Sequence, residues 1–357
     1  MKTSSAFIIG AAKQQDEIGS LDKVLLLESQ LLQRGITPKY LVIEPLSADW
    51  HSPEKEHHFR SGCAPIEALA EAKKLIENGE AAVVISGKDH IKTGYSRGER
   101  LSKMAVYGQS YPLTQAYTDL AYTFSENHAI TEQQFKKFAS ALFENYQVSF
   151  RNALSDSFTP ELLPDLRWYK PITDLFRGVD CANPMVDFSG RLLLTRADIA
   201  EQLGVDKSQW LKVKAVGLSR LEGDGRDFLT DIARYDHLQQ AYQQACDEAD
   251  IDFVQLFKGG EALLETYTCY PVVPMAFLLV SGLVDILEDI PDFLAKHSIT
   301  ITGGMNLARA AWNNPALNAL VLMHQCLCNG PEKFGLIHGN GGLGYRQGIA
   351  IVECVDS

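Results

Sequence analysis

The sequence lacks any hydrophobic run long enough to cross a membrane as a helix. The best candidate, Val272 to Val284, is well short of the roughly 20 residues that a bilayer requires, and it contains Pro274. The start of the chain is only weakly signal-like, with apolar residues Ala6 to Ala12 after a single lysine, and it is better interpreted as a first buried strand. We therefore expect a cytoplasmic protein without a membrane span.

Basic runs and paired cysteines are also missing. The formal net charge is -12 and lysine and arginine nowhere cluster, so a polyanion would be repelled and we expect no nucleic-acid partner. The seven cysteines are scattered. Cys326 and Cys328 form C-x-C without a second ligand pair, so we predict no metal site. Such cysteines fit a reducing compartment.

What the sequence does contain is an alternation of strand-like and helical segments. Its 357 residues, 46% of them hydrophobic, suffice for about two domains. The alternation predicts an α/β fold with buried sheets. Between about Tyr111 and Arg177 strand patterns vanish, which indicates an inserted helical subdomain. The predicted strands are Ala6–Ala11, Tyr40–Glu44, Ala81–Ser86, Leu211–Leu218, Ile299–Thr302, Phe334–His338 and Gly348–Val355, and the clearest helices are Leu21–Arg34, Pro65–Asn78, Thr131–Asn152 and Pro315–Cys328.

An internal duplication is also visible. Residues 61–89 and 312–342 each contain a turn, a helix that begins at a proline, and a buried strand that ends in glycine. Pro65 and Pro315 suit the first helical position because no N–H partner is needed there. Gly79 and Gly330 follow the two helices as stop residues. The repeat predicts a pseudo-symmetric fold, although α/β proteins repeat such units freely.

The stretch GNGGLG, Gly339 to Gly344, matches the dinucleotide pattern G-x-G-x-x-G. A dinucleotide site requires a helix after this turn, whereas residues 345–355 read as a second strand, so the pattern excludes that function. Two interpretations stay open. The turn is either a plain hairpin with a satisfied His338, or a set of backbone N–H groups that stabilise an oxyanion beside an imidazole suited to proton transfer.

Four segments in order resemble the thiolase superfamily: residues 61–87, 265–277, 299–314 and 335–344. ETYTCYP and TGG are similar to a divergent branch described as acetyl-CoA acetyltransferases and sterol-carrier-protein-type thiolases. The resemblance implies two βαβαβαββ halves in a five-layer αβαβα arrangement. It divides the chain into 1–110, the first part of the N-terminal half; 111–180, an inserted helical loop domain; 181–250, the completion of that half; and 251–357, the C-terminal half.

The resemblance also implies chemistry. It predicts an acyltransferase that acts on acyl-CoA thioesters through a cysteine acyl-enzyme, without a cofactor, as a homodimer. A small zinc-ribbon and oligonucleotide-binding-fold protein is a possible partner. The candidate catalytic residues are Cys63, Cys269 and His338. The candidate substrate-binding residues, all in glycine-rich turns, are Gly303, Gly304, Asn340, Gly341 and Gly342.

The sequence departs from the thiolase pattern at several positions. Gly62 falls opposite the usual nucleophile, and Cys63 takes that place only if one residue is deleted in the turn. Ala310 replaces the usual histidine base, and Tyr267 replaces the usual asparagine. Cys63 is either a nucleophile or a small residue at a helix start, and Cys269 is either reactive or a buried thiol. The alternative function is therefore a non-catalytic, acyl-CoA-binding or partner-dependent subunit.

Overall fold

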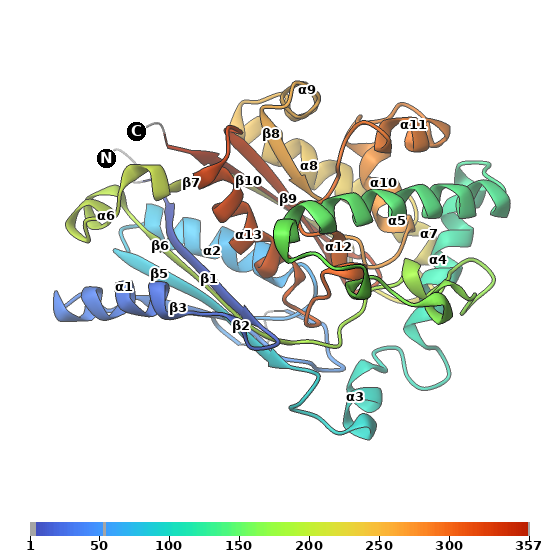
Figure 1. Cartoon of the computed structure of the whole chain (residues 1–357), viewed down its shortest axis with the longest axis horizontal. Helices are drawn as coiled ribbons and strands as arrows, with labels where there is room; N and C mark the ends of the chain where they lie inside the picture. Colours follow the sequence, from blue (N-terminus) through green and yellow to red (C-terminus); the bar gives the residue numbers. More distant parts are fainter. Residues whose placement is uncertain (1–4, 53–54, 356–357) are drawn as a thin grey trace.

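The described strands form one mixed sheet in the order β4-β3-β5-β6-β1-β7-β10-β9-β8, with β2 paired to β1. The computed structural model describes residues 5–52 and 55–355 (Figure 1). The strands are β1 (Phe7–Gln15), β2 (Ile18–Gly19), β3 (Lys39–Ile43), β4 (His58–Phe59), β5 (Ala82–His90), β6 (Asp187–Thr195), β7 (Leu211–Arg220), β8 (Ala262–Glu265), β9 (Phe334–Gly341) and β10 (Arg346–Cys354).

Helices cover the sheet and extend beyond one end of it. The α-helices are α1 (Asp22–Gln33), α2 (Ala64–Glu77), α3 (Arg97–Met104), α4 (Leu113–Asn127), α5 (Glu132–Leu154), α6 (Ala197–Gln202), α7 (Leu229–Ile232), α8 (Asp236–Ala249), α9 (Phe253–Lys258), α10 (Val272–Val280), α11 (Ile290–Leu294), α12 (Gly304–Leu307) and α13 (Pro315–Asn329). Short 3-10 turns lie at Ser155–Ser157, Pro160–Leu162, Leu166–Tyr169, Gly178–Asp180, Lys207–Gln209, Arg226–Phe228 and Leu287–Asp289.

The sheet is built from the same motif twice. In β1-α1-β3-α2-β5-β6, β3 is parallel to β5, and β6 is antiparallel to both β5 and β1. In β7-α8-β8-α13-β9-β10, β8 is parallel to β9, and β10 is antiparallel to both β9 and β7. The two motifs join where β1 pairs with β7 over two residues. The predicted pseudo-symmetric α/β fold is thus confirmed.

The helices form layers around the two parts of the sheet. Helix α1 packs on β1 and β6, and α8 packs on β7 and β10. Between the two parts lie α2, which contacts β3 and β5 on one side and β9 and β10 on the other, and α13, which contacts β9, β1 and β6. Figure 1 shows α2 and α13 between the two groups of strands. The arrangement is α-β-α-β-α.

The two central helices are apolar on more than one face, as their position requires. A helix between two sheets has no solvent-facing side, so it needs a wider apolar surface than an amphipathic surface helix. In α13 every residue from Pro315 to Val321 is buried, and in α2 the run from Ala64 to Ile66 is buried with Ala68, Leu69 and Ala72. The shared core between the sheets holds these helices in register.

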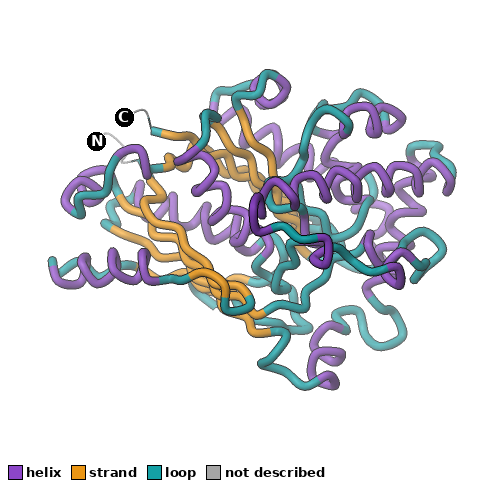
Figure 2. Tube along the Cα trace, in the orientation of Figure 1, coloured by secondary structure: helices purple, strands orange, loops and turns teal. Residues whose placement is uncertain are grey.

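The long connection between β5 and β6 carries α3, α4 and α5 and contains no strand among its described residues. A second connection, between β8 and α13, carries α10, α11 and α12. Figure 2 shows these helices gathered beyond one end of the strands. None of the helices in the described part of the chain is both long and apolar enough to span a bilayer.

Some elements differ from the sequence-based expectation. Ile299–Thr302 is not a strand, because the Glu265 carboxylate accepts the backbone N–H groups of Ile301 and Thr302 at 2.6 and 3.0 Å. Strands β2, β4, β6 and β8 were not predicted. Residues 181–250 supply β6 to the first motif, but they also supply β7 and α8, which belong to the second motif of the sheet.

We predict that Gly217→Ala in β7 lowers the free energy of unfolding by about 1–3 kcal/mol, since a Cβ there would lie 1.9 Å from the Ala241 carbonyl oxygen of α8. The measurement is urea unfolding followed by circular dichroism. Gly98→Ala is the matched control, because no heavy atom lies within 4 Å of its added methyl group, and it should be neutral or stabilise by up to about 1 kcal/mol. Equal effects of the two substitutions would contradict the close packing of α8.

Candidate functional site

A cavity of about 400 Å³ lies where the inserted segment meets the ends of the central elements. Its volume is in the range of small-molecule sites. Its wall is largely apolar, and no lysine or arginine is among its lining residues in the described part of the chain. The lining is Trp50, Gly62, Leu101, Met104, Ala105, Gly108, Gln109, Pro112, Leu113, Thr114, Tyr117, Ala182, Pro184, Tyr267, Cys269, Tyr270, Met305, Ala310, Trp312, Asn340 and Gly342.

Cys269 is the predicted catalytic cysteine that reaches this cavity. Its thiol donates to the hydroxyl oxygen of Tyr117 at 3.4 Å, and Asn340 donates to the same oxygen at 3.4 Å. Tyr117 in turn donates to the Gly342 carbonyl at 2.9 Å. Burial raises the pKa of Cys269 to about 12, so the sulfur is a neutral thiol at neutral pH.

His338 lies behind this cluster and does not line the large cavity. Its Nε2 is 2.8 Å from Gln347 Oε1, and its Nδ1 accepts the Tyr267 N–H at 3.4 Å. Burial lowers the pKa of His338 to about 4, so the imidazole is neutral at pH 7. Both ring nitrogens have protein partners, and the geometry favours a positioning role over direct proton transfer to a ligand.

Cys63 lies at the N-cap of α2, next to the helix start as predicted, but its thiol is directed away from the cavity. It is 1% exposed, and its sulfur packs against Gly348 of β10, where an added Cβ would lie 2.7 Å away. Burial, with Glu67 nearby, raises the pKa of this thiol well above its usual value. The structure does not bring Cys63 together with Cys269 around one ligand space.

Gly62, the residue before Cys63, lines the cavity instead. A Cβ at Gly62 would lie 2.0 Å from the Tyr267 hydroxyl oxygen and 2.3 Å from the Asn340 carbonyl oxygen. The Tyr267 hydroxyl therefore fills the space that a side chain at Gly62 would need. Ala310 and Tyr267 also line the cavity, so all three positions that depart from the thiolase pattern face it.

The predicted glycine-rich turns divide between two places. Gly342, with φ of +61°, and Asn340 line the large cavity. Gly341 packs on the α2 start, where a Cβ would lie 2.5 Å from Ser61 Oγ. Gly304 borders a small cavity, of about 10 Å³, shared with His338, while Gly303 packs on Phe150 of α5. Only Asn340 and Gly342 are placed to contact a ligand in the large cavity.

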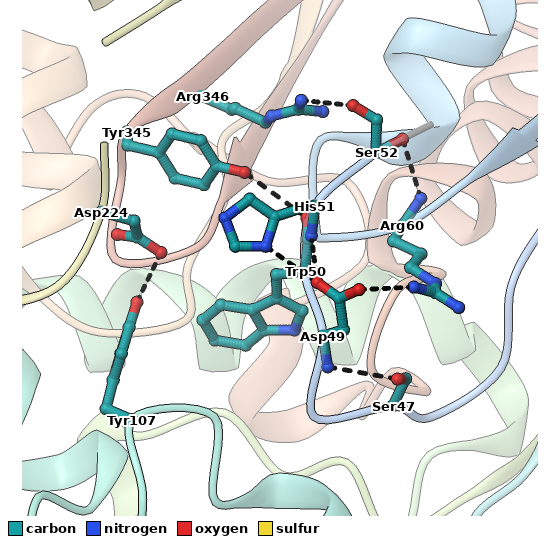
Figure 3. Close-up of polar contacts among 10 residues, drawn as sticks. All are labelled: Ser47, Asp49, Trp50, His51, Ser52, Arg60, Tyr107, Asp224, Tyr345 and Arg346. Atoms are coloured by element: carbon teal, nitrogen blue, oxygen red, sulfur yellow. Dashed lines mark hydrogen bonds and ion pairs between the residues drawn. The ribbon is translucent and has the colours of Figure 1, made fainter. Parts of the chain in front are cut away.

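Trp50 covers one side of the cavity from the loop between β3 and β4. Its ring centroid is 5.5 Å from that of Trp312 and 5.9 Å from that of Tyr107. Figure 3 shows how the residues at the start of β10 hold this loop: Tyr345, just before the strand, donates to the Trp50 carbonyl at 3.5 Å, and Arg346 donates to the Ser52 carbonyl.

The same loop has its own polar contacts. Asp49 accepts from Arg60 at 2.7 Å and lies 2.8 Å from the His51 ring, as Figure 3 also shows. Arg346 additionally binds Glu67 of α2 at 2.6 Å. These contacts connect the loop to both motifs of the sheet, so the position of Trp50 depends on both.

Asp224 fixes the glycine-rich turn from the opposite side. One carboxylate oxygen accepts the Leu343 N–H at 3.0 Å. The other accepts the Tyr107 hydroxyl at 2.8 Å, as Figure 3 shows. Because Tyr107 precedes α4, this carboxylate joins the inserted segment to the turn that carries Asn340 and Gly342. Sequence reasoning missed Asp224, Tyr117 and Gln347, which lie far from the recognised motifs or outside them.

No protein-family model and no curated protein matches the sequence. The structure, however, is similar over its whole length to an SCP2-thiolase-like protein type 1 (STLP1) from Mycobacterium smegmatis. The TM-score is 0.69 at 16% sequence identity, and the match covers 100% of this chain and 79% of that chain. The chain has a thiolase-like fold.

A second thiolase-like comparison is with the solved structure of an Ltp2-ChsH2(DUF35) aldolase, with a TM-score of 0.65 at 12% identity over 98% of each chain. Sequence identities this low establish the shared fold and leave the chemistry to the site itself. The thiolase-like fold accounts for the pseudo-symmetric motifs, but the large cavity presents Gly62 and Ala310 where the resemblance led us to look for a nucleophile and a base.

We predict that His338 makes the free energy of unfolding depend on pH. Its pKa of about 4 in the folded chain is below the value of about 6.5 for an unfolded histidine, so the stability it contributes is present above pH 6.5 and is lost as the pH falls toward 4. Between pH 7.5 and 5 the loss is about 2 kcal/mol.

The matching variant is His338→Phe, and the measurement is urea unfolding at both pH values. The variant lacks the two hydrogen bonds at either pH, but the free-energy difference from wild type should shrink by about 2 kcal/mol at pH 5. His324, whose pKa is also lowered to about 4, is common to both proteins and cancels. A constant difference would contradict the buried neutral imidazole.

Proposed function

We propose that this thiolase-like protein binds an acyl thioester in the 400 Å³ cavity and accepts the acyl group on Cys269, in a complex with a partner protein. One observation carries the proposal: among the described residues that line the cavity Cys269 is the cysteine, its thiol donates to the Tyr117 hydroxyl oxygen at 3.4 Å, and Asn340 and Gly342 line the same cavity. Cys63, the alternative nucleophile, packs away from the cavity on β10.

The cavity wall favours the acyl portion of the substrate. Trp50, Met104, Leu113, Met305 and Trp312 provide apolar surface, whereas no cationic side chain is among the lining residues that the structure describes. The phosphates of a coenzyme A thioester therefore lie outside the cavity, and the acyl group with its thioester carbonyl lies inside. Burying apolar acyl surface supplies the binding energy.

The proposed reaction transfers the acyl group from one sulfur atom to another. The Cys269 sulfur forms a bond to the carbonyl carbon, the bond from that carbon to the coenzyme A sulfur breaks, and the thiol proton of Cys269 goes to the departing sulfur. The Asn340 amide and backbone N–H groups of the glycine-rich turn are the candidate donors to the transient oxyanion. A neutral thiol with a pKa of about 12 requires assistance in losing its proton.

A partner enters the proposal through two observations. Ala310 and Gly62 occupy the positions at which the thiolase pattern has its histidine base and its nucleophile. The chain therefore supplies fewer reactive groups than a self-sufficient thiolase. The aldolase complex to which the chain is similar contains a DUF35 component by its description. The second candidate function is accordingly a thioester-binding subunit whose chemistry depends on such a partner. A homodimer stays a prediction.

We expect acylation of Cys269 when the protein is incubated with acyl-CoA. Intact-mass and peptide-mapping mass spectrometry should show one acyl group on the peptide with Cys269, lost in Cys269→Ala and retained in Cys63→Ala. The experiment is run with and without a co-purified DUF35-type partner. Acylation at Cys63, or no acylation under either condition, would rule out the covalent proposal and leave the binding-subunit function.

We also expect the cavity to bind the acyl chain. Leu113→Glu places a charge in the apolar wall and should weaken binding of palmitoyl-CoA at least about 10-fold, because burying a carboxylate without a partner is costly. The substitution is at the first residue of α4, where an acidic side chain suits the helix. The measurement is quenching of tryptophan fluorescence.

The control for this binding measurement is Leu166→Glu, at a site that is 85% exposed and outside the cavity lining. It introduces the same charge on the inserted segment and should bind as the wild type does. If the two variants bind equally well, the acyl chain does not occupy the cavity.

A further inference from the structure

A continuous series of hydrogen bonds runs from Gln347, inside the second motif, to the Cys269 thiol. The donor and the acceptor of each bond follow from the orientation of the Gln347 amide. The Gln347 Nε2 donates to the Gly344 carbonyl and to Asn340 Oδ1, each at 2.8 Å. Because a carbonyl oxygen only accepts, the amide of Gln347 has one orientation. Its Oε1 therefore accepts from His338 Nε2, which carries the imidazole proton.

The next members follow from this assignment. Asn340 Oδ1 is an acceptor, so its Nδ2 is the donor to the Tyr117 hydroxyl oxygen at 3.4 Å. Tyr117 gives its single hydroxyl proton to the Gly342 carbonyl at 2.9 Å. The remaining contact of the hydroxyl oxygen, with Cys269 Sγ at 3.4 Å, must have the thiol as donor. The resting arrangement holds the Cys269 proton on sulfur and directs it at Tyr117.

We propose that Tyr117 is the proton-transfer partner of Cys269 and that Gln347 is the positioning residue that fixes the direction of these hydrogen bonds. This inference rests on the proposed function of Cys269. As the sulfur bonds to the thioester carbonyl, its proton moves to the Tyr117 oxygen. The original hydroxyl proton of Tyr117 turns from the Gly342 carbonyl to the departing coenzyme A sulfur, which leaves as a thiol. Tyr117 is neutral before and after the step.

The surroundings favour a transfer between neutral groups. The titratable side chains that interact electrostatically with Cys269 come from several elements and are uncharged at neutral pH: Tyr117, Tyr146, Cys181, Tyr235, Tyr267 and Tyr270. Burial raises the pKa of each of them. None of these described neighbours is a cation that could stabilise a separated thiolate or phenolate, whereas a relay through one hydroxyl creates neither.

Tyr117 is also held rigidly enough for this role. Its ring stacks on that of Tyr270 with centroids 4.0 Å apart and planes 15° apart. Both rings line the cavity, and Tyr270 follows Cys269 in the chain. The hydroxyl therefore has a fixed position relative to the sulfur, and a small rotation of its O–H bond suffices to redirect the proton.

The test is the rate at which iodoacetamide alkylates Cys269, followed by peptide mapping between pH 7 and 9. Tyr117→Phe removes the proton acceptor and should slow alkylation about 10-fold or more, since a hydrogen bond to a charged or charging group is among the stronger ones. Tyr235→Phe is the matched control, because it removes a buried tyrosine hydroxyl that has no hydrogen-bond partner and should leave the rate unchanged.

The positioning role of Gln347 is tested by comparing its substitution in the wild-type and Tyr117→Phe backgrounds. Gln347→Leu should slow alkylation in the wild-type background and have no further effect in Tyr117→Phe, because a positioning residue acts only through the group it positions. Loss of packing alone would slow both backgrounds equally. Urea unfolding of every variant verifies that the fold is retained.

The proposal is overturned if iodoacetamide alkylates Cys269 as fast in Tyr117→Phe as in the wild type. It is also overturned if Cys269 is not alkylated in either protein between pH 7 and 9. Because iodoacetamide requires no acyl-CoA, this outcome is separate from that of the acylation experiment. A slow Tyr117→Phe variant with no acyl-enzyme in the wild type would retain the proton-transfer pair and reject the acyl transfer. If the wild type is acylated on Cys269 and Tyr117→Phe is alkylated at the wild-type rate, the acyl transfer is retained and the proton-transfer pair is rejected.

Discussion

The burial of α2 and α13 between the two parts of the sheet is the constraint on which the rest of the structure depends. Each helix contacts strands of both motifs, so neither motif can complete its core alone. Gly62 and Cys63 directly precede α2, and the end of β9 packs on them, with Gly339 and Gly341 close to Cys63. The central packing thus brings the start of one motif's helix against the hairpin of the other, which creates the floor of the cavity.

The cavity combines a polar floor with an apolar wall, and the two have different origins. The floor comes from the repeated motifs, through Gly62, Tyr267, Asn340 and Gly342. Much of the wall comes from residues 101–114, in the connection between β5 and β6. The polar groups of the floor already satisfy one another, as buried groups must. A ligand that binds here therefore gains mainly from apolar contact.

The sequence predicted the architecture well because the elements of the fold have strong local patterns. The central helices have a proline at the start and a glycine after the end, and the strands β1, β3, β5, β7, β9 and β10 are short apolar runs. β8 is only four residues long, and ITIT at 299–302 has a strand-like composition. The prediction of a strand at 299–302 was wrong because the carboxylate of Glu265, a residue distant in sequence, accepts hydrogen bonds from the backbone N–H groups of Ile301 and Thr302.

The site was predicted only in part, for a related reason. Cys269 and Asn340 belong to motifs that can be seen in the sequence, but Tyr117 is 152 residues from Cys269 and lies in a segment with no motif. Gln347 could have been found from the hairpin register, since it is directly opposite Asn340 across β9 and β10. The direction of the Cys63 side chain depends on the register of the turn before α2. Gly62 faces the cavity, whereas Cys63, one residue later, faces β10.

The duplicated topology explains why the insertion and the glycine-rich turn meet. The connection β5–β6 in the first motif corresponds to β9–β10 in the second. The second motif closes this connection with a tight turn, in which Gly342 has a positive φ that side chains rarely adopt. The first motif replaces it with the long excursion through α3, α4 and α5. Related positions at one end of the sheet thus carry a bare backbone turn and a side-chain-rich insertion, and the Tyr117 hydroxyl on the Gly342 carbonyl is where they join.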